Sequence, residues 1–361
     1  MVSAVRAELY RCGRLLTALV LGILLVACGE RKPVVSESFV FGTRVEIQVA
    51  GDLPEAQIRP AMAQVLAEFD RLHRTYHAWQ PSELTQLNDA LAQGRGVRVT
   101  PEMAALLTEA QNFSRQSDAL FDPGIGRLIA IWGFHADQYV ARLPDPAAVS
   151  AWLKSRPSIL DIRLENKPDG VWVSSRNSGV ALDFGGSLKG TALDRAAEIL
   201  KKAGIHHALI NIGGNVMALG DRYGKPWRVA IQAPRYGGPL AILELNDGEA
   251  TGTSGDYQRY FEVDGRRYPH LLDPGTGYPA PGAQAVTIVV SGPDAGVRSD
   301  VLTKPVFIAG EAAWLAMAAR LGVRQVLRVN DRGQVNVTGS LADRLKFMPH
   351  DGKLPDIHRI E

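Results

Sequence analysis

The order of strand-like and helix-like segments constrains the fold of this chain more than any single motif does. Segments in which apolar and polar residues alternate, as in strands with one buried face, are Phe39–Val49, Trp227–Gln232, Leu240–Leu245, Tyr257–Val263 and Arg267–Leu271. Segments with the apolar spacing of helices are Ile58–Leu72, Pro101–Ser117, Ile125–Phe134, Ala147–Lys154, Thr191–Ala203 and Ala312–Leu321. Strands and helices are mixed without strict βαβ alternation, and the dipeptide Asp264-Gly265 predicts a hairpin. This order favours an α+β fold over a doubly wound sheet.

Length and charge exclude several classes of function. The chain has 361 residues and a formal net charge of +2, so it can bury a large core and has no strongly basic surface. Nucleic acid is therefore not an expected partner. After residue 27, no segment is apolar over the length that a membrane-spanning helix needs. We expect one domain over residues 39–340 and a loosely packed, charged tail over residues 341–361.

The N-terminus resembles a bacterial export signal. Three arginines precede the apolar run Leu15–Ala27, which is short for a membrane span but typical of a signal peptide. The run leads into LVAC, which resembles the site where signal peptidase cuts before a lipidated cysteine; an ordinary signal peptide or an anchor helix is the alternative. We expect residues 1–27 to be removed, Cys28 to be lipidated, and residues 28–38 to tether the domain to the periplasmic face of a bacterial membrane. Cys12 lies in the predicted signal, so no thiol remains for catalysis, a disulfide or a metal site.

A glycine-rich segment that runs into a helix indicates a phosphate-containing ligand. Residues 183–190 have the sequence DFGGSLKG, and residues 211–215 have the sequence NIGGN. Glycines let backbone N–H groups approach a ligand closely, and a helix N-terminus adds partial positive charge. Lys189 can place its ammonium on the same anion. The segment lacks the G-x-x-x-x-G-K-[ST] spacing, so a P-loop is not predicted.

Further polar clusters follow one another along the chain and carry a family resemblance. They are FGT at 41–43, PSELTQLN at 81–88, FDP at 121–123, TSGDY at 253–257 and PHLLDP at 269–274. Together with DFGGSLKG and NIGGN, in one collinear order from about Phe39 to Gly310, they resemble the ApbE family of FAD:protein FMN transferases. The resemblance implies an α+β, T-fold-related structure of mixed and antiparallel sheets with packed helices and FAD in a central cleft. It also implies transfer of FMN from FAD to a threonine or serine hydroxyl, with release of AMP and with Mg²⁺ at the pyrophosphate.

The resemblance assigns roles to individual residues. Contacts with FAD are implied for Phe41, Tyr76, Ala119, Leu120, Phe121, Asp183, Lys189, Gly213, Gly214, Ser254, Gly255 and His270. For some of these a structural role is the alternative: Tyr76 in the core, Asp183 as a capping or turn residue, and Ser254 in a strand-end turn.

The resemblance also implies a metal site. Its ligands are Asp300, Thr303 and the backbone carbonyl of Gly186. The family usually has a threonine four residues after this aspartate, where this chain has Lys304. We hypothesise that the Lys304 ammonium replaces part of the metal's charge, because both neutralise pyrophosphate oxygens.

Three residues are candidates for the group that takes the proton from the incoming hydroxyl: His270, Asp273 and Asp300. An imidazole with an ordinary pKa accepts a proton near neutral pH, whereas a purely structural histidine is the alternative.

The expected acceptor is an exported or membrane flavoprotein with a motif like Asp-x-x-(Ser/Thr)-Gly-Ala-(Thr/Ser). Two other functions use the same residues. One is an FAD pyrophosphatase that gives free FMN and AMP, and the other is a non-catalytic FAD-binding carrier or maturation lipoprotein of a respiratory complex.

Overall fold

The computed structural model of the protein describes residues 32–136 and 140–361. The predicted signal peptide and Cys28 lie outside the described residues. Within the described ranges, no helix combines the length and the apolar character that crossing a membrane requires.

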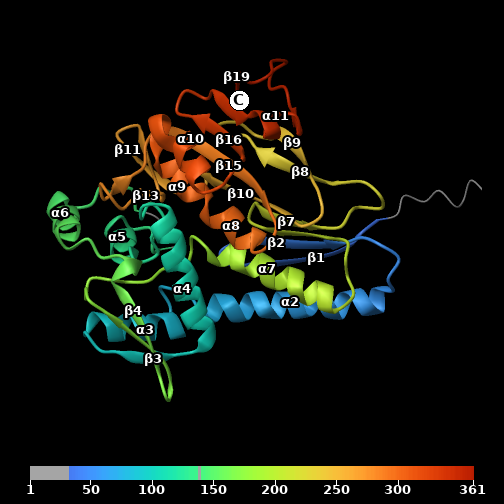
Figure 1. The fold of residues 1–361 in the computed structure, drawn as a ribbon. Coiled ribbons are helices and arrows are strands. Elements are labelled where there is room, and N and C mark those ends of the chain that lie inside the picture. Colours follow the sequence, from blue (N-terminus) through green and yellow to red (C-terminus); the bar gives the residue numbers. More distant parts are fainter. Residues whose placement is uncertain (1–31, 137–139) are drawn as a thin grey trace, which may run out of the picture. The chain divides into compact units, whose positions relative to one another are not determined.

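A nine-stranded sheet is the largest element among the described residues, and it runs in the order β1-β2-β6-β7-β10-β15-β16-β17-β19 (Figure 1). Its strands are β1 (Val34–Val40), β2 (Thr43–Val49), β6 (Ala208–Ile212), β7 (Asn215–Leu219), β10 (Glu249–Gly255), β15 (Ala283–Ser291), β16 (Gln325–Asn330), β17 (Val335–Thr338) and β19 (Ile357–Ile360). Neighbouring strands are antiparallel, except that β17 and β19 are parallel. This mixed arrangement confirms the predicted α+β class.

Helices cover one face of this sheet, and a smaller sheet covers the other. The long helix α2 (Glu55–Thr75) contacts α7 (Leu188–Lys202), and the two lie side by side in Figure 1. Strand β15 contributes to two cores, because alternate side chains point to opposite faces. Its residues Val286, Ile288 and Val290 belong to the helix-side core, and Ala285 and Val289 belong to the core on the other face.

The second core lies under a three-stranded sheet, β18-β9-β8. Its strands are β8 (Trp227–Gln232), β9 (Pro239–Leu245) and β18 (Leu345–Phe347). The remaining helices are α3 (Glu83–Ala92), α4 (Pro101–Gln116), α5 (Gly126–Ile131), α6 (Pro146–Ser155), the 3-10 turn η1 (Ile159–Asp161), α8 (Ala295–Val301), α9 (Thr303–Ile308), α10 (Gly310–Arg320) and α11 (Gly339–Ala342). The remaining strands are β3 (Val97–Val99), β4 (Ile162–Lys167), β5 (Gly170–Ser175), β11 (Tyr260–Val263), β12 (Arg266–Pro269), β13 (Leu272–Asp273) and β14 (Tyr278–Pro279).

The start of the domain differs from the prediction. The segment Phe39–Val49 is not one strand, because β1 begins at Val34 and turns back into β2. The predicted tether covers residues 28–38. Its last residues, from Val34 onward, are therefore part of the central sheet. Phe41 and Gly42 form the turn with φ angles of 57° and 70°. Tight hairpin turns need positive φ, but phenylalanine rarely adopts it, so no local pattern predicts a turn at this position.

The predicted loose tail, residues 341–361, is also wrong. Leu341 is fully buried, β18 pairs with β9, and β19 pairs with β17 at the edge of the central sheet. The side chains of β19 are mostly exposed, and Arg359 forms ion pairs with Asp343 and Glu361. An edge strand with charged side chains is well suited to this position, but its composition is the same as that of a solvated tail.

Candidate functional site

Two helices meet at a pair of glycines on the helix-covered face of the sheet. Helix α7 begins at Leu188 rather than at Thr191, so Lys189 and Gly190 lie in its first turn. A Cβ atom on Gly190 would lie 2.5 Å from the carbonyl oxygen of Gly296 in α8, and a Cβ on Gly296 would lie 2.5 Å from the carbonyl oxygen of Gly190. Only glycine allows the two backbones to come this close.

Asp194 fixes the orientation of α8 from the neighbouring helix. Its two carboxylate oxygens accept hydrogen bonds of 2.8 Å from the backbone N–H groups of Gly296 and Val297. Asp294, which precedes α8, makes no side-chain cap, so Asp194 supplies the cap from α7. The sequence analysis missed this residue, because its partners lie about a hundred positions away.

The close approach of the helices places the Asp300 carboxylate at the first turn of α7. Asp300 is 2% exposed, and its Oδ2 accepts a hydrogen bond of 3.0 Å from the N–H of Gly190. The Nζ of Lys189 lies 3.7 Å from the same oxygen. The Nζ of Lys304 contacts Oδ1 and donates to the backbone carbonyl of Asp300 at 2.7 Å. Burial alone would raise the pKa of Asp300, but the two ammonium groups outweigh it and hold that pKa below its ordinary value.

This group of Asp300, Lys189 and Lys304, called here the Asp300 cluster, carries a net positive charge. Two ammonium groups and one carboxylate sum to +1. Burial, partly offset by the charge of Asp300, lowers the pKa of Lys304 to about 8, so this lysine stays largely protonated at neutral pH. The cluster therefore suits an anionic ligand.

Hydroxyl groups from two other elements complete the surroundings of Asp300. Thr303 donates from Oγ1 to the carbonyl oxygen of Asp300 at 2.7 Å. Since this uses the only proton of Thr303, the Oγ of Ser254, 2.7 Å away, donates to Thr303. Gly186 lies against the side chains of Lys304 and Phe121, whose carbon atoms would be 3.5 and 3.4 Å from a Cβ at position 186. The structure thus brings together residues predicted from four separate segments.

Asn215 is a further residue of this site that the sequence analysis missed. It follows the glycines of NIGGN, is 3% exposed, and its amide contributes to lowering the pKa of Asp300. Its buried Nδ2 makes a weak, poorly aligned interaction with the Asp300 carboxylate, so Asn215 helps to hold this carboxylate in its ionised form.

The residues around Asp300 do not fit the predicted magnesium ion. Mg²⁺ requires oxygen ligands in a near-octahedral arrangement, but ammonium groups already contact both carboxylate oxygens of Asp300. An ammonium cannot be a ligand, and its charge repels a divalent cation. Among the described residues there is also no group of three or more His, Cys, Asp or Glu side chains placed to hold a metal. The predicted metal roles of Gly186, Asp300 and Thr303 therefore have no support in this geometry.

His270 faces the Asp300 cluster and differs from the prediction in its basicity. Its Nδ1 lies 3.1 Å from the carbonyl oxygen of Arg259, so Nδ1 carries the hydrogen and Nε2 keeps a free lone pair. Burial, and then the charges of Arg259, Lys189 and Lys304, lower the pKa of His270 to about 3. The expected ordinary imidazole is thus a neutral hydrogen-bond acceptor instead.

Asp273 has a local structural role. Its Oδ1 accepts a 2.7 Å hydrogen bond from the N–H of Gly275 in the turn between β13 and β14. This is a side-chain-stabilised turn. Of the three candidate bases, His270 is the one with a free lone pair near the positive charges.

The aromatic candidates separate into buried and accessible residues. Tyr76 is 2% exposed and packs edge-on against Phe184, so the structure favours its core role over a stacking role. Phe41, in the β1–β2 turn, contacts the rings of Phe69 and His73. Trp79 is 38% exposed, and its Nε1 donates to Oδ2 of Asp183 at 3.0 Å.

Two predicted FAD-contacting segments are turns with unusual backbones. Gly213 and Gly214 join β6 to β7 with φ angles of 58° and 93°, and no atom lies within 4 Å of a Cβ built on Gly214. Ala119 has a φ of 61° and precedes Leu120 and the buried Phe121. Positive φ at alanine is strained, and such strain is common near functional sites.

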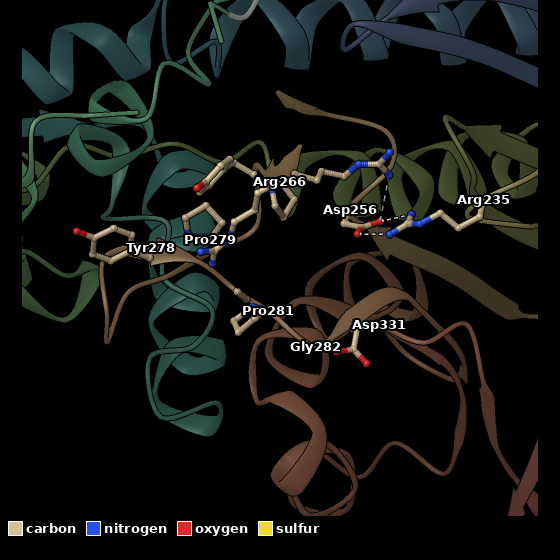
Figure 2. A pocket seen from close by; sticks show the side chains of 13 residues that line it. Arg235, Asp256, Arg266, Tyr278, Pro279, Pro281, Gly282 and Asp331 are labelled. Atoms are coloured by element: carbon tan, nitrogen blue, oxygen red, sulfur yellow. Dashed lines mark hydrogen bonds and ion pairs between the residues drawn. The ribbon is translucent and has the colours of Figure 1, made fainter. Parts of the chain in front are cut away.

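A pocket of about 170 Å³ is lined in part by residues next to Ser254-Gly255 and His270 in the sequence, but none of the predicted FAD-binding residues lines it (Figure 2). Its lining includes Arg235 and Asp256, which form a two-point ion pair with distances of 2.7 and 2.6 Å. Asp256 follows Ser254-Gly255, and another lining residue, Pro269, precedes His270. The pocket is therefore a neighbouring feature and not the predicted flavin cleft.

Comparisons with known proteins agree with these features. Residues 41–327 match the model of the ApbE family. A Rhodobacter capsulatus protein named FAD:protein FMN transferase is 42% identical over 315 residues, which are 87% of this chain and 59% of that protein. A Treponema pallidum protein of the same name is 28% identical over 342 residues, which are 89% of this chain and 92% of that protein. The crystal structure of the ApbE protein from Thermotoga maritima superposes with a TM-score of 0.78 at 29% identity and covers 87% of this chain and 99% of that one.

Proposed function

The chain belongs to the ApbE family, and on that premise we propose that it is an FAD:protein FMN transferase. The observation that carries this proposal is the Asp300 cluster, in which a buried carboxylate holds two ammonium groups at the N-terminus of α7. Helix N-termini and ammonium groups both bind phosphate oxygens, so the diphosphate of FAD is the part of the substrate that this cluster suits.

In the proposed reaction, the hydroxyl oxygen of an acceptor threonine or serine attacks the phosphorus of the FMN half of FAD. A new P–O bond forms to the acceptor, the bond between that phosphorus and the bridging oxygen breaks, and AMP leaves with the bonding electron pair. The hydroxyl proton goes to a base. Phosphoryl transfer of this kind depends mainly on positioning and on charge neutralisation, which Lys189 and Lys304 supply.

We assign the base to His270. Its Nε2 carries a lone pair that can accept a proton, whereas the oxygens of Asp300 already accept from Gly190 and Lys304. The low pKa of His270 arises from burial first, then from Arg259, and in smaller part from Lys189 and Lys304. The negative charge of a bound FAD diphosphate offsets only the lysine contribution to this low pKa.

The isoalloxazine and adenine rings are assigned to the accessible aromatic residues. Trp79 offers an exposed face that is oriented by its hydrogen bond to Asp183, and Phe41 lies at a hairpin turn. Both residue types stack on planar rings. Ser254, which is hydrogen-bonded to Thr303, and Gly255 provide backbone close to the cluster, and we assign the Gly213-Gly214 turn to the rest of the FAD molecule.

The test uses purified protein, FAD and a peptide with the sequence pattern Asp-x-x-Thr-Gly-Ala-Thr. The expected product is a peptide heavier by the FMN phosphoryl group, formed with one AMP per adduct and measured by mass spectrometry and chromatography. A matched peptide with alanine in place of both threonines stays unmodified. Free FMN and AMP without an adduct would indicate a pyrophosphatase, and bound FAD that never turns over would indicate a carrier.

We further propose that the enzyme is a lipoprotein at the periplasmic face of the membrane, with Cys28 as the lipidated residue and an exported or membrane flavoprotein as the acceptor. This proposal is supported by the apolar run and LVAC sequence at residues 15–28. Labelling of cells with an alkyne fatty acid should mark the wild type and not the Cys28→Ser variant. Labelling of both forms, or of neither, contradicts the proposal.

A further inference from the structure

The side chain of Lys304 is directed back onto the aspartate one helical turn earlier. Its Nζ contacts Oδ1 of Asp300 and donates to the carbonyl oxygen of the same residue at 2.7 Å. The Lys304 side chain is 15% exposed and that of Asp300 is 2% exposed, so the pair is almost excluded from water. A buried ion pair with two contacts holds its ammonium in a fixed position.

We propose that the Lys304 ammonium is the resident cation of this site, and that FAD binding and cleavage proceed without a divalent metal ion at Asp300. This inference rests on the proposed function, because it concerns the same diphosphate. The bonds that form and break are unchanged. The ammonium neutralises charge on the diphosphate as AMP leaves, in the role that a metal ion would otherwise have.

The oxygen atoms of Asp300 and the hydroxyl of Thr303 are already in use. Lys304 contacts Oδ1, and the N–H of Gly190 donates to Oδ2, with Lys189 close by. The carbonyl oxygen of Asp300 accepts from Thr303 and Lys304, and the hydroxyl of Thr303 in turn accepts from Ser254. A metal ion would have to displace Lys304 before it could reach these atoms.

Electrostatic repulsion also opposes the binding of a metal ion. The Asp300 cluster carries a charge of +1 with its own lysines. A second cation would enter a buried, positively charged region, where repulsion is weakly screened. The FAD diphosphate carries negative charge and meets no such barrier.

The outer part of the Lys304 side chain is held in place by its neighbours. Its stem lies against Gly186, with Cε 3.5 Å from the position of a Cβ on that glycine, and the backbone of Lys304 belongs to α9. The ring of Phe121 also lies against Gly186, with Cε2 3.4 Å from the same Cβ position. A bound metal ion exchanges with ions in the solvent. The Lys304 ammonium cannot, because it is part of the chain and its side chain is packed against its neighbours.

The experiment measures FAD binding by calorimetry after treatment with EDTA, and again with added MgCl₂. We expect the wild-type dissociation constant to be the same in both conditions. For Lys304→Thr, which restores a hydroxyl and removes the ammonium, we expect binding weakened by about tenfold or more in EDTA and recovered with Mg²⁺. A titration with MnCl₂ alone should show binding to Lys304→Thr and none to the wild type.

Two further variants serve as controls. Lys304→Met removes the cation without adding an oxygen, so its FAD binding should be weak with or without Mg²⁺. Lys202→Thr makes the same change at an exposed position near the end of α7 and should behave as wild type. Circular dichroism identifies any variant that does not fold, and in that case the wild-type measurements with FAD and MnCl₂ decide the question alone.

The outcomes separate this inference from the proposed function. Wild-type protein that binds FAD only with Mg²⁺, or that binds MnCl₂ at Asp300, overturns the inference and leaves the transferase proposal intact. Wild-type protein that binds no FAD in either condition overturns the transferase proposal, and the inference with it.

Discussion

Both faces of the central sheet bury an apolar core, but only the helix-covered face also buries the Asp300 cluster. Under β8, β9 and β18 the core is apolar, with Trp227, Leu243 and Leu245 almost fully buried. On the helix-covered face, the apolar core gives way at α7 and α8 to the Asp300 cluster, whose carboxylate is equally buried. Buried charge costs free energy unless it is paired. The comparison suggests that one face supplies stability and that the other devotes part of its buried volume to ligand binding.

The largest expected effect is that of Asp300→Ala. Removing one partner of a buried ion pair leaves two ammonium groups unpaired and should cost about 3–5 kcal/mol in unfolding free energy. FAD turnover should also be lost. Urea denaturation and AMP release measure the two effects, with Asp89→Ala, an exposed carboxylate in helix α3, as the control. A variant of unchanged stability would contradict the pairing.

The second prediction concerns the apolar face. Leu243→Ala removes a fully buried side chain and should lower the unfolding free energy by about 2–5 kcal/mol through lost burial and cavity formation. At temperatures where the variant is folded, its affinity for FAD should equal that of the wild type in calorimetry. A loss of affinity would mean that packing on the apolar face affects FAD binding on the other face.

A smaller effect is expected at the junction of α7 and α8. Asp194→Ala removes two hydrogen bonds to the N-terminus of α8, and the loss of such a cap costs about 1–2 kcal/mol. Because α8 carries Asp300, FAD affinity should fall as well. Glu198→Ala, one turn further along α7 and exposed, is the matched control. Equal behaviour of the two variants would exclude a positioning role for Asp194.

The last prediction is a pH dependence of the unfolding free energy, and it concerns Glu109 in helix α4, near Asp194 and Asp294. Burial, and then Asp294 and Asp194, raise the pKa of Glu109 to about 7. The carboxyl of Glu109 therefore binds its proton more tightly in the folded protein than in the unfolded chain. Its contribution to the unfolding free energy is fully present below about pH 4.5 and is lost as the pH rises through 7. Glu109→Gln should therefore be more stable than wild type at pH 8 and not at pH 4.5. Urea denaturation at both pH values tests this, and a constant difference would argue against it.

Local sequence patterns predicted most of the elements correctly. The helix over Thr191–Ala203 is present with Gly204 after it at a φ of 77°, and Asp264-Gly265 forms the expected hairpin turn. These features depend on spacing and on the backbone preferences of single residues. The β1–β2 turn and the paired C-terminal segment were missed, because neither has a local pattern that distinguishes it from a strand or a tail.

The site was predicted less completely than the fold. The segments that carry Lys189, Gly186, Ser254, Thr303 and Asp300 were identified, and the structure brings them together. Tyr76 has the core role that the sequence allows as an alternative, whereas the side chains of Asn215 and Asp194 have roles that the sequence does not indicate. The last two act through partners that are distant in the chain, so no spacing rule could indicate them.

The sequence by itself determined which residue types and turns are present: a glycine-rich helix start, a lysine four positions after an aspartate, and an α+β order of elements. Only the tertiary structure decided that the ammonium of Lys304 contacts the Asp300 carboxylate at the crossing of α7 and α8. The physical reason is that backbone preferences act between neighbours in the chain. Charge pairing and the pKa shifts that follow from it depend on distances and burial, which exist only once the helices have packed.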